Sequence, residues 1–197
     1  MNAPAIWIHQ FNRILGLSPE REQALSDYIT ETWPGPVYVK ALDGISYMAA
    51  FDRPLGASGA AGGDSWTWSQ LHATPWIVPT ADHPLLEGRL AAAIAQAAGS
   101  VILDLEPYEH FWHGNRDDEQ AWITAYSKMT DAPVAISLDH RRLPGFPGPS
   151  FLDLASRILP QCYWTTFRRP WLEVLQEARE RCAPIGKPVE YVFPGDS

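Results

Sequence analysis

Short apolar runs alternate with longer amphipathic stretches along most of the 197-residue chain. The short runs are typical of strands buried on both faces, whereas the longer stretches place apolar residues at helical spacing. Predicted strands lie at residues 5–9, 37–40, 74–78, 101–103, 133–139, 160–164 and 188–193. Predicted helices lie at residues 18–33, 65–72, 82–99, 117–129 and 170–181, with a short one beginning at 150.

Strands that alternate regularly with helices indicate an α/β protein with parallel strands. Seven strands are visible, so we expect an α/β fold of the (β/α)8 TIM-barrel type, with the eighth strand missing or atypical. The length fits a single domain over residues 1–197 that buries a sizeable core.

Two carboxylates end the predicted strand at residues 101–103. Asp104 and Glu106 stand two positions apart, directly before Pro107, and alternate residues of a strand point to the same side. Their Cα atoms are expected roughly 6.5–7 Å apart, at the strand end where parallel α/β proteins bind ligands. Like charges this close push one pKa up, which separates a proton donor from an anion. The alternative is that one acid caps a helix and the other is a solvated loop residue.

Polar residues of other strands are candidates for the same cavity. Lys40 ends an apolar strand, and because an unpaired buried charge is costly, we expect its ammonium group in the cavity beside Asp104 and Glu106. Four more polar residues at or near predicted strands are expected to bind substrate: Asp43, Asp139, Gln161 and Glu190.

Nine tryptophans is a high number for this length. Trp76, Trp112 and Trp164 fall at or just past predicted strand ends, where an indole face can stack on a flat ligand or on the C–H face of a sugar. The predicted stacking surfaces for a ligand are Trp76, Tyr108, Tyr163 and Trp164.

A formal net charge of -8 argues against nucleic acid and anionic membranes as partners, because both attract an excess of Lys and Arg. No apolar stretch is long enough to span a bilayer and no signal peptide is visible. The sequence leaves the location unknown, with cytoplasmic or phage-associated as the default. Cys162 and Cys182 lack metal-ligand spacing, and we expect buried free thiols. His110 and His113 have no third ligand at matching spacing, so neither a metal nor a cofactor is expected.

Three segments resemble a known family. Residues 37–44, 103–106 and 160–164 are similar to the second, fourth and sixth strands of glycoside-hydrolase-like TIM barrels, uncharacterised bacterial and phage proteins related to Chalaropsis-type lysozymes. The resemblance implies that Glu106 protonates the glycosidic oxygen while Asp104 orients or stabilises a substrate-assisted intermediate. The chain departs from the lysozymes at the end of strand one, where they carry an acid, and at strand eight.

The resulting hypothesis is a glycoside hydrolase that acts on an N-acetylated glycan such as peptidoglycan. Two alternatives belong to other classes: a non-catalytic carbohydrate-binding barrel that stacks sugars on its aromatic residues, and a structural barrel within a larger phage or surface assembly. Hydrolysis that disappears in Glu106→Gln while glycan binding persists distinguishes the enzyme from both. The sequence leaves the oligomeric state open.

Overall fold

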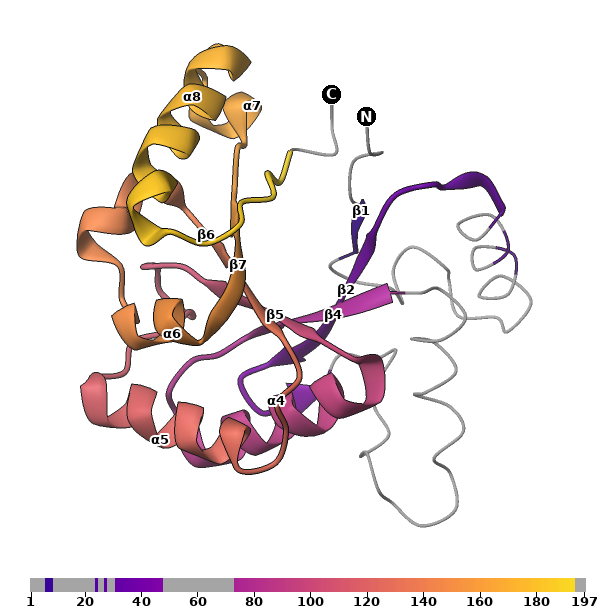
Figure 1. Ribbon diagram of the computed structural model, residues 1–197, viewed down its shortest axis with the longest axis vertical. Helices are drawn as coiled ribbons and strands as arrows, with labels where there is room; N and C mark the ends of the chain where they lie inside the picture. The colour runs from indigo at the N-terminus through magenta and orange to yellow at the C-terminus, as the bar shows by residue number, and fades with distance from the viewer. Residues whose placement is uncertain (1–5, 9–23, 25–26, 28–30, 48–72, 194–197) are drawn as a thin grey trace.

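The computed structural model describes residues 6–8, 24, 27, 31–47 and 73–193 (Figure 1). The predicted helix at 65–72 lies outside the described residues, as does most of the predicted helix at 18–33. Of the predicted first strand, residues 6–8 are described and form β1.

A mostly parallel sheet of seven strands runs through the described chain. Its path is β1-β2-β4-β5-β6-β7, and the short β3 pairs with β2 in the antiparallel direction. The strands are β1 (Ile6–Ile8), β2 (Val37–Asp43), β3 (Ser46–Tyr47), β4 (Ala73–Val78), β5 (Val101–Leu105), β6 (Val134–Leu138) and β7 (Ala155–Pro160). Every residue of β5 and β6 is buried, as expected for parallel strands covered on both faces.

Helices and 3-10 turns follow the strands. They are α4 (Pro84–Ala98), α5 (Arg116–Ser127), η2 (His140–Gly145), α6 (Pro149–Leu154), α7 (Trp164–Phe167), α8 (Trp171–Cys182) and η3 (Ala183–Ile185). Helix α4 matches the predicted helix at 82–99: it has a proline in its first turn and ends at Gly99, whose left-handed φ of 81° favours glycine.

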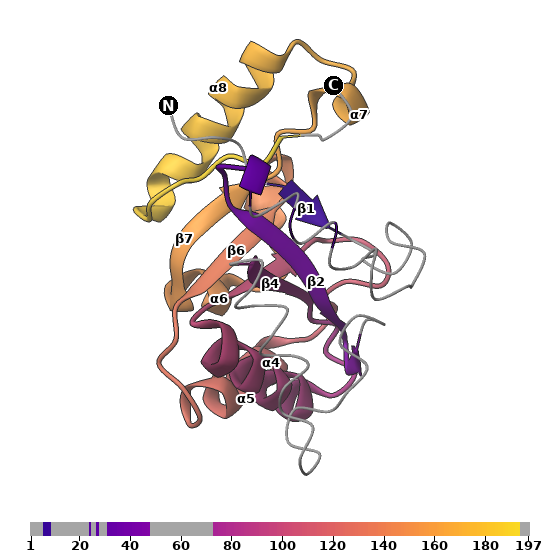
Figure 2. The same ribbon diagram turned by 90° about the vertical axis from the view of Figure 1, so that its right-hand side faces the viewer.

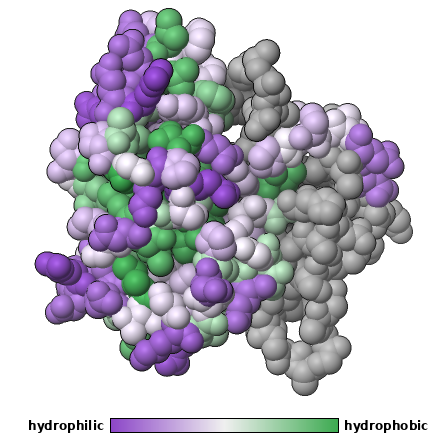
Figure 3. Space-filling view, in the orientation of Figure 1, coloured by the Kyte–Doolittle hydropathy of each residue, from purple (hydrophilic) through white to green (hydrophobic). Residues whose placement is uncertain are grey.

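Apolar residues form separate cores on the two faces of the sheet. Leu103 faces the helices, where Trp122 of α5 and Phe151 of α6 pack in the same cluster. The opposite face carries a smaller cluster that includes Trp76 and Ile102. Helices α4 and α5 lie side by side, whereas α8 lies at the other end of the molecule (Figures 1 and 2). Hydrophilic residues gather over α8 (Figure 3).

The expected (β/α)8 barrel is wrong. The sheet path has two ends, and within the described residues no pairing joins β1 to β7. Residues 188–193, predicted as a strand, make isolated parallel bridges, from Ile158 to Val189 and from Gln161 to Val192. Alternating strands and helices occur in closed barrels and in open parallel sheets alike, so the sequence pattern establishes an α/β fold and does not establish closure.

The predicted strand at 160–164 is also displaced. Strand β7 ends at Pro160, and Trp164 begins α7. Strand β7 begins directly after α6 and includes the exposed Ser156 and the partly exposed Arg157. Because these two residues are polar, the sequence does not show an apolar run at the start of the strand. Gln161 nevertheless follows β7 directly, and its N–H donates to the carbonyl of Leu138 at 2.9 Å, which fixes it beside the end of β6.

Candidate functional site

Strands β5 and β7, which lie on either side of β6, bring two carboxylates and one amide together. Asp104 lies in β5, Glu106 follows the same strand, and Gln161 follows β7. The Gln161 Nε2 atom donates to Asp104 Oδ1 at 3.0 Å and to Glu106 Oε1 at 2.6 Å. The two acceptor oxygens are therefore no farther apart than the sum of these distances. We call Asp104, Glu106 and Gln161 the acid cluster.

Ser137 and His140 hold the acid cluster in place. The buried Ser137 places its hydroxyl oxygen 3.2 Å from Gln161 Nε2, and it also makes a hydrogen bond with Asp104. His140 Nδ1 lies 3.0 Å from the carbonyl oxygen of Gln161. Because a carbonyl can only accept, His140 donates from Nδ1. Burial lowers the pKa of His140, which keeps this neutral tautomer.

Burial dominates the electrostatics of the two acids. It raises the pKa of Asp104, and the adjacent charge of Glu106 raises it further, to about 7, although Ser137, Lys40 and Gln161 oppose the shift. Burial likewise raises the pKa of Glu106, more than the Gln161 hydrogen bond lowers it. Interacting carboxyl groups titrate as a pair, so near neutral pH the two acids share a proton.

Lys40 lies on the same face of the sheet as the acids. Its Nζ atom donates to Asp43 at 2.8 Å and lies 5.1 Å from the centre of the Trp76 ring. Its positive charge lowers the pKa of Asp104. The structure therefore places Lys40 within electrostatic reach of Asp104, and Asp43 is the ion-pair partner of Lys40.

Two tryptophans cannot serve as stacking surfaces in this structure. Trp76 is 1% exposed and Trp112 is 2% exposed. Trp76 packs between Trp7 and the ammonium group of Lys40, and Trp112 packs edge-on against Phe151. Trp76, predicted to stack on a ligand, has no exposed face here, because a strand covered on both faces buries the side chains near its end as well.

Asp139 has a different role from the one predicted. Its carboxylate accepts hydrogen bonds from the backbone N–H of Arg141 at 3.0 Å, from Arg141 Nε at 2.8 Å and Nη2 at 2.6 Å, and from the Tyr108 hydroxyl at 2.7 Å. Burial acts to raise the pKa of Asp139, but these bonds outweigh it and lower the pKa. Asp139 is thus an internal anchor for Tyr108 and Arg141, with its acceptor positions already filled.

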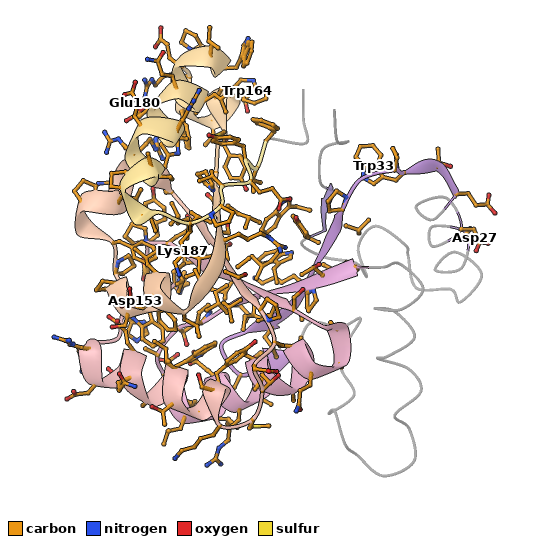
Figure 4. The ribbon with its side chains drawn as sticks, viewed as in Figure 1. Asp27, Trp33, Asp153, Trp164, Glu180 and Lys187 are labelled. Atoms are coloured by element: carbon orange, nitrogen blue, oxygen red, sulfur yellow. The ribbon has the colours of Figure 1, made fainter. Side chains whose placement is uncertain are left out.

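The remaining aromatic candidates divide between two places. Tyr163 lies near the acid cluster: burial raises the pKa of its hydroxyl, and the charges of Asp104 and Glu106 raise it further. Trp164 lies at the end of the molecule that carries α8, where its ring packs against Phe193 with centroids 5.5 Å apart (Figure 4). The structure does not bring Trp164 to the acids.

Glu190 lies away from the acid cluster. Its carboxylate accepts a hydrogen bond from the Tyr38 hydroxyl and lies 3.3 Å from Arg157 Nε. Tyr38 and Arg157 stand near the amino ends of β2 and β7, whereas Asp104 and Gln161 stand at or near carboxyl ends. The predicted role of Glu190 in substrate binding is not supported by this position.

Sequence reasoning missed three residues that shape the site: Ser137, His140 and Arg141. The alternation along β6 places Ser137 on the same side as Asp139, and this pattern is visible in the sequence. His140 and Arg141 lie in the turn η2 that follows β6. The side-chain directions in such a turn follow no strand or helix periodicity, so the sequence does not predict where these residues point. The guanidinium carbon of Arg141 lies 3.5 Å from the centre of the Phe167 ring, a contact between distant segments.

A hollow of about 1090 Å³ lies beside the acid cluster, and we call it the loop hollow. It is formed by residues at and after the carboxyl ends of β2, β4 and β5. Tyr108 lines the hollow, and its hydroxyl donates to Asp139 at 2.7 Å. The acids themselves are not in its wall.

The described part of the chain contains neither a candidate metal site nor a candidate membrane-spanning helix. No three His, Cys, Asp or Glu side chains there are grouped to hold a metal ion. No helix among the described residues combines the length and the apolar character needed to cross a bilayer. Cys162 and Cys182 are buried free thiols.

Comparison with known proteins adds no family to this picture. The chain matches no protein-family model, and no curated protein matches it. The functional argument therefore depends on the geometry of the acid cluster.

Proposed function

We propose that this chain is a glycoside hydrolase that acts on an N-acetylated glycan, peptidoglycan or a related polymer, with Glu106 as general acid and Asp104 as its anionic partner. The observation that carries the proposal is the single Gln161 amide nitrogen that bonds both carboxylates, at 3.0 and 2.6 Å. Two acids held together at the carboxyl ends of parallel strands are the minimal equipment for cleaving a glycosidic bond.

The difference in exposure favours this division of roles. Burial and the charge of Glu106 raise the pKa of Asp104 to about 7, while Ser137, Lys40 and Gln161 oppose the shift. Burial raises the pKa of Glu106 and the charge of Asp139 raises it further, against the Gln161 hydrogen bond and the charge of Arg141. Asp104 is 6% exposed, whereas Glu106 is half-buried and is the acid that a substrate can reach. The shared proton is therefore delivered from Glu106.

The reaction follows from these positions. Glu106 gives its proton to the glycosidic oxygen as the bond from that oxygen to the anomeric carbon breaks. The carbonyl oxygen of the substrate's N-acetyl group bonds to the anomeric carbon in its place, while the ionised Asp104 stabilises the positive charge that develops on the acetamido group. Water then attacks the anomeric carbon as the bond from that carbon to the acetamido oxygen breaks. The attacking water gives a proton to the ionised Glu106, which restores the acid, and the sugar leaves.

The test compares wild type with Glu106→Gln on peptidoglycan and on chitooligosaccharides. We expect release of reducing ends to fall by about 10²–10⁴-fold in the variant, while binding of the glycan persists. Glu180→Gln is the matched control, because Glu180 lies on the exposed side of α8 (Figure 4). Equal cleavage by wild type and Glu106→Gln, or no cleavage by wild type, would contradict the proposal.

A further inference from the structure

The loop hollow lies next to the acid cluster at the same edge of the sheet. Tyr108 and Glu109 line the hollow and follow Glu106 along the chain by two and three residues. A chain molecule held at Glu106 can therefore extend into the hollow. With about 1090 Å³, the hollow is as large as pockets of about 300–1,000 Å³ that enclose drug-sized ligands.

The walls of the hollow suit an uncharged, hydroxyl-rich ligand. Asp82 and Glu109 supply exposed carboxylate acceptors, and Tyr108 and Phe111 supply aromatic faces, with their rings 6.5 Å apart. Carboxylates and aromatic rings together bind the hydroxyl groups and the C–H face of a sugar. None of the described residues that line the hollow is Lys or Arg; its basic side chains are His83, His110 and His113, and its carboxylates Asp43, Asp82 and Glu109 repel an anionic ligand.

Glu109 is the most informative of these residues. Its carboxylate has no hydrogen-bond or ion-pair partner among the described residues, whereas Asp82 lies 3.4 Å from His113 and Asp43 pairs with Lys40. The acceptor capacity of Glu109 is thus available to a ligand. In addition, Ala81 and His110 have φ of 79° and 75° in the loops that form the hollow, a strained conformation for residues with a Cβ that occurs frequently at ligand sites.

We propose that the loop hollow is an additional subsite that binds an uncharged segment of the glycan chain next to the cleavage point. The inference rests on the proposed function and extends it, because it makes the enzyme endo-acting on a polymer. It also names the substrate class: sugars without carboxylate, sulfate or phosphate groups at this position, as in an N-acetylglucosamine chain.

The experiment measures binding of chitobiose and chitohexaose by calorimetry, with Glu106→Gln as the background so that the chains stay intact. We expect the hexamer to bind at least about tenfold more tightly than the dimer. Adding Glu109→Trp, which fills part of the hollow, should reduce this ratio to about one. Ser46→Trp, at a second exposed position in the wall, should do the same if Glu109→Trp does not fold.

Glu180→Trp on α8 is the control for a new surface tryptophan and should leave the ratio unchanged. A ratio that both hollow-filling variants leave intact would overturn the subsite while the hydrolase proposal stands. Tighter binding of a hexameric polyuronate than of chitohexaose would overturn the uncharged specificity. If the Glu106→Gln background binds neither chitobiose nor chitohexaose and wild type cleaves no glycan, the proposed function itself fails.

Discussion

A carboxyl group that is 6% exposed, as in Asp104, favours its neutral form. Burial and the charge of Glu106 raise the pKa of Asp104 from 3.8 to about 7 in the folded chain. Between these values the folded chain binds more protons than the unfolded chain does. The free energy of unfolding contributed by Asp104 is therefore fully present below about pH 4 and is lost as the pH rises to about 7.

Asp104→Asn tests this dependence. An amide of the same shape has no charge to bury. At pH 8 we therefore expect the free energy of unfolding of the variant to exceed that of wild type by about 2–4 kcal/mol. At pH 4 the two proteins should differ by less than about 1 kcal/mol, because Asp104 is then protonated in the folded state. Urea unfolding at both pH values measures the difference.

Asp153→Asn provides the control, since Asp153 is an exposed acid on α6 (Figure 4). Its free energy of unfolding relative to wild type should be the same at pH 8 as at pH 4. If Asp104→Asn also shows no gain at pH 8 relative to pH 4, the carboxylate of Asp104 is not in the environment described for it.

At the scale of elements, the turn η2 connects β6 to the site through Arg141. Its guanidinium group forms an ion pair with Asp139. The Asp139 side chain is 2% exposed, and the Arg141 side chain is 34% exposed. Arg141→Met leaves this buried carboxylate without its main partner. We expect a loss of about 2–3 kcal/mol at pH 7, reduced from the value for a fully buried pair because Arg141 is partly solvated.

Chemical denaturation compares this variant with Arg89→Met, which removes an exposed arginine from α4 and should change the stability by less than about 0.5 kcal/mol. Adding Asp139→Asn to Arg141→Met should recover part of the loss, because no unpaired charge remains buried. Equal stability of the Arg141→Met and Arg89→Met variants would show that η2 does not anchor Asp139.

The pairing of α4 with α5 depends on Gly88. A Cβ at this position would overlap the carbonyl oxygen of Trp122 and lie 3.1 Å from the Cβ of Ala125. Glycine to alanine in a helix usually stabilises a protein, but here the overlap with backbone reverses the sign. We expect Gly88→Ala to lower the free energy of unfolding by about 1–3 kcal/mol, measured by urea unfolding.

Gly145→Ala is the comparison, because a Cβ there would meet no atom within 4 Å. It should be within about 0.5 kcal/mol of wild type. A Gly88→Ala variant as stable as wild type would mean that the two helices pack less closely than described.

At the scale of the whole molecule, the sequence predicts local order better than closure. The strands at 37–40, 74–78 and 133–139 and helix α4 are confirmed, because apolar runs, proline and glycine act within a few residues. Closure of a barrel depends on which strands meet at the ends of the sheet, and no local pattern records it. The expected barrel was wrong for that reason.

The candidate site divides in the same way. The spacing of Asp104 and Glu106 on one strand predicts a shared direction, and one Gln161 nitrogen bonds both in the structure. The positions of Glu190 and Trp164 and the anchoring role of Asp139 depend on contacts between distant segments. Trp76 is buried because side chains pack on both faces of the sheet. Its position at the end of a predicted strand gives no sign of this packing in the sequence.

The most direct measurement is a carbon-13 NMR titration of the side-chain carboxyl groups. We predict a carboxyl resonance of the Asp104 and Glu106 pair that titrates near pH 7, disappears in Asp104→Asn, and moves to higher pH in Gln161→Met, which removes the donor that lowers both pKa values. The Asp153 carboxyl, assigned by its loss in Asp153→Asn, serves as the exposed reference. Titration of both Asp104 and Glu106 below pH 5 in wild type would contradict the shared proton and, with it, the proposed general acid.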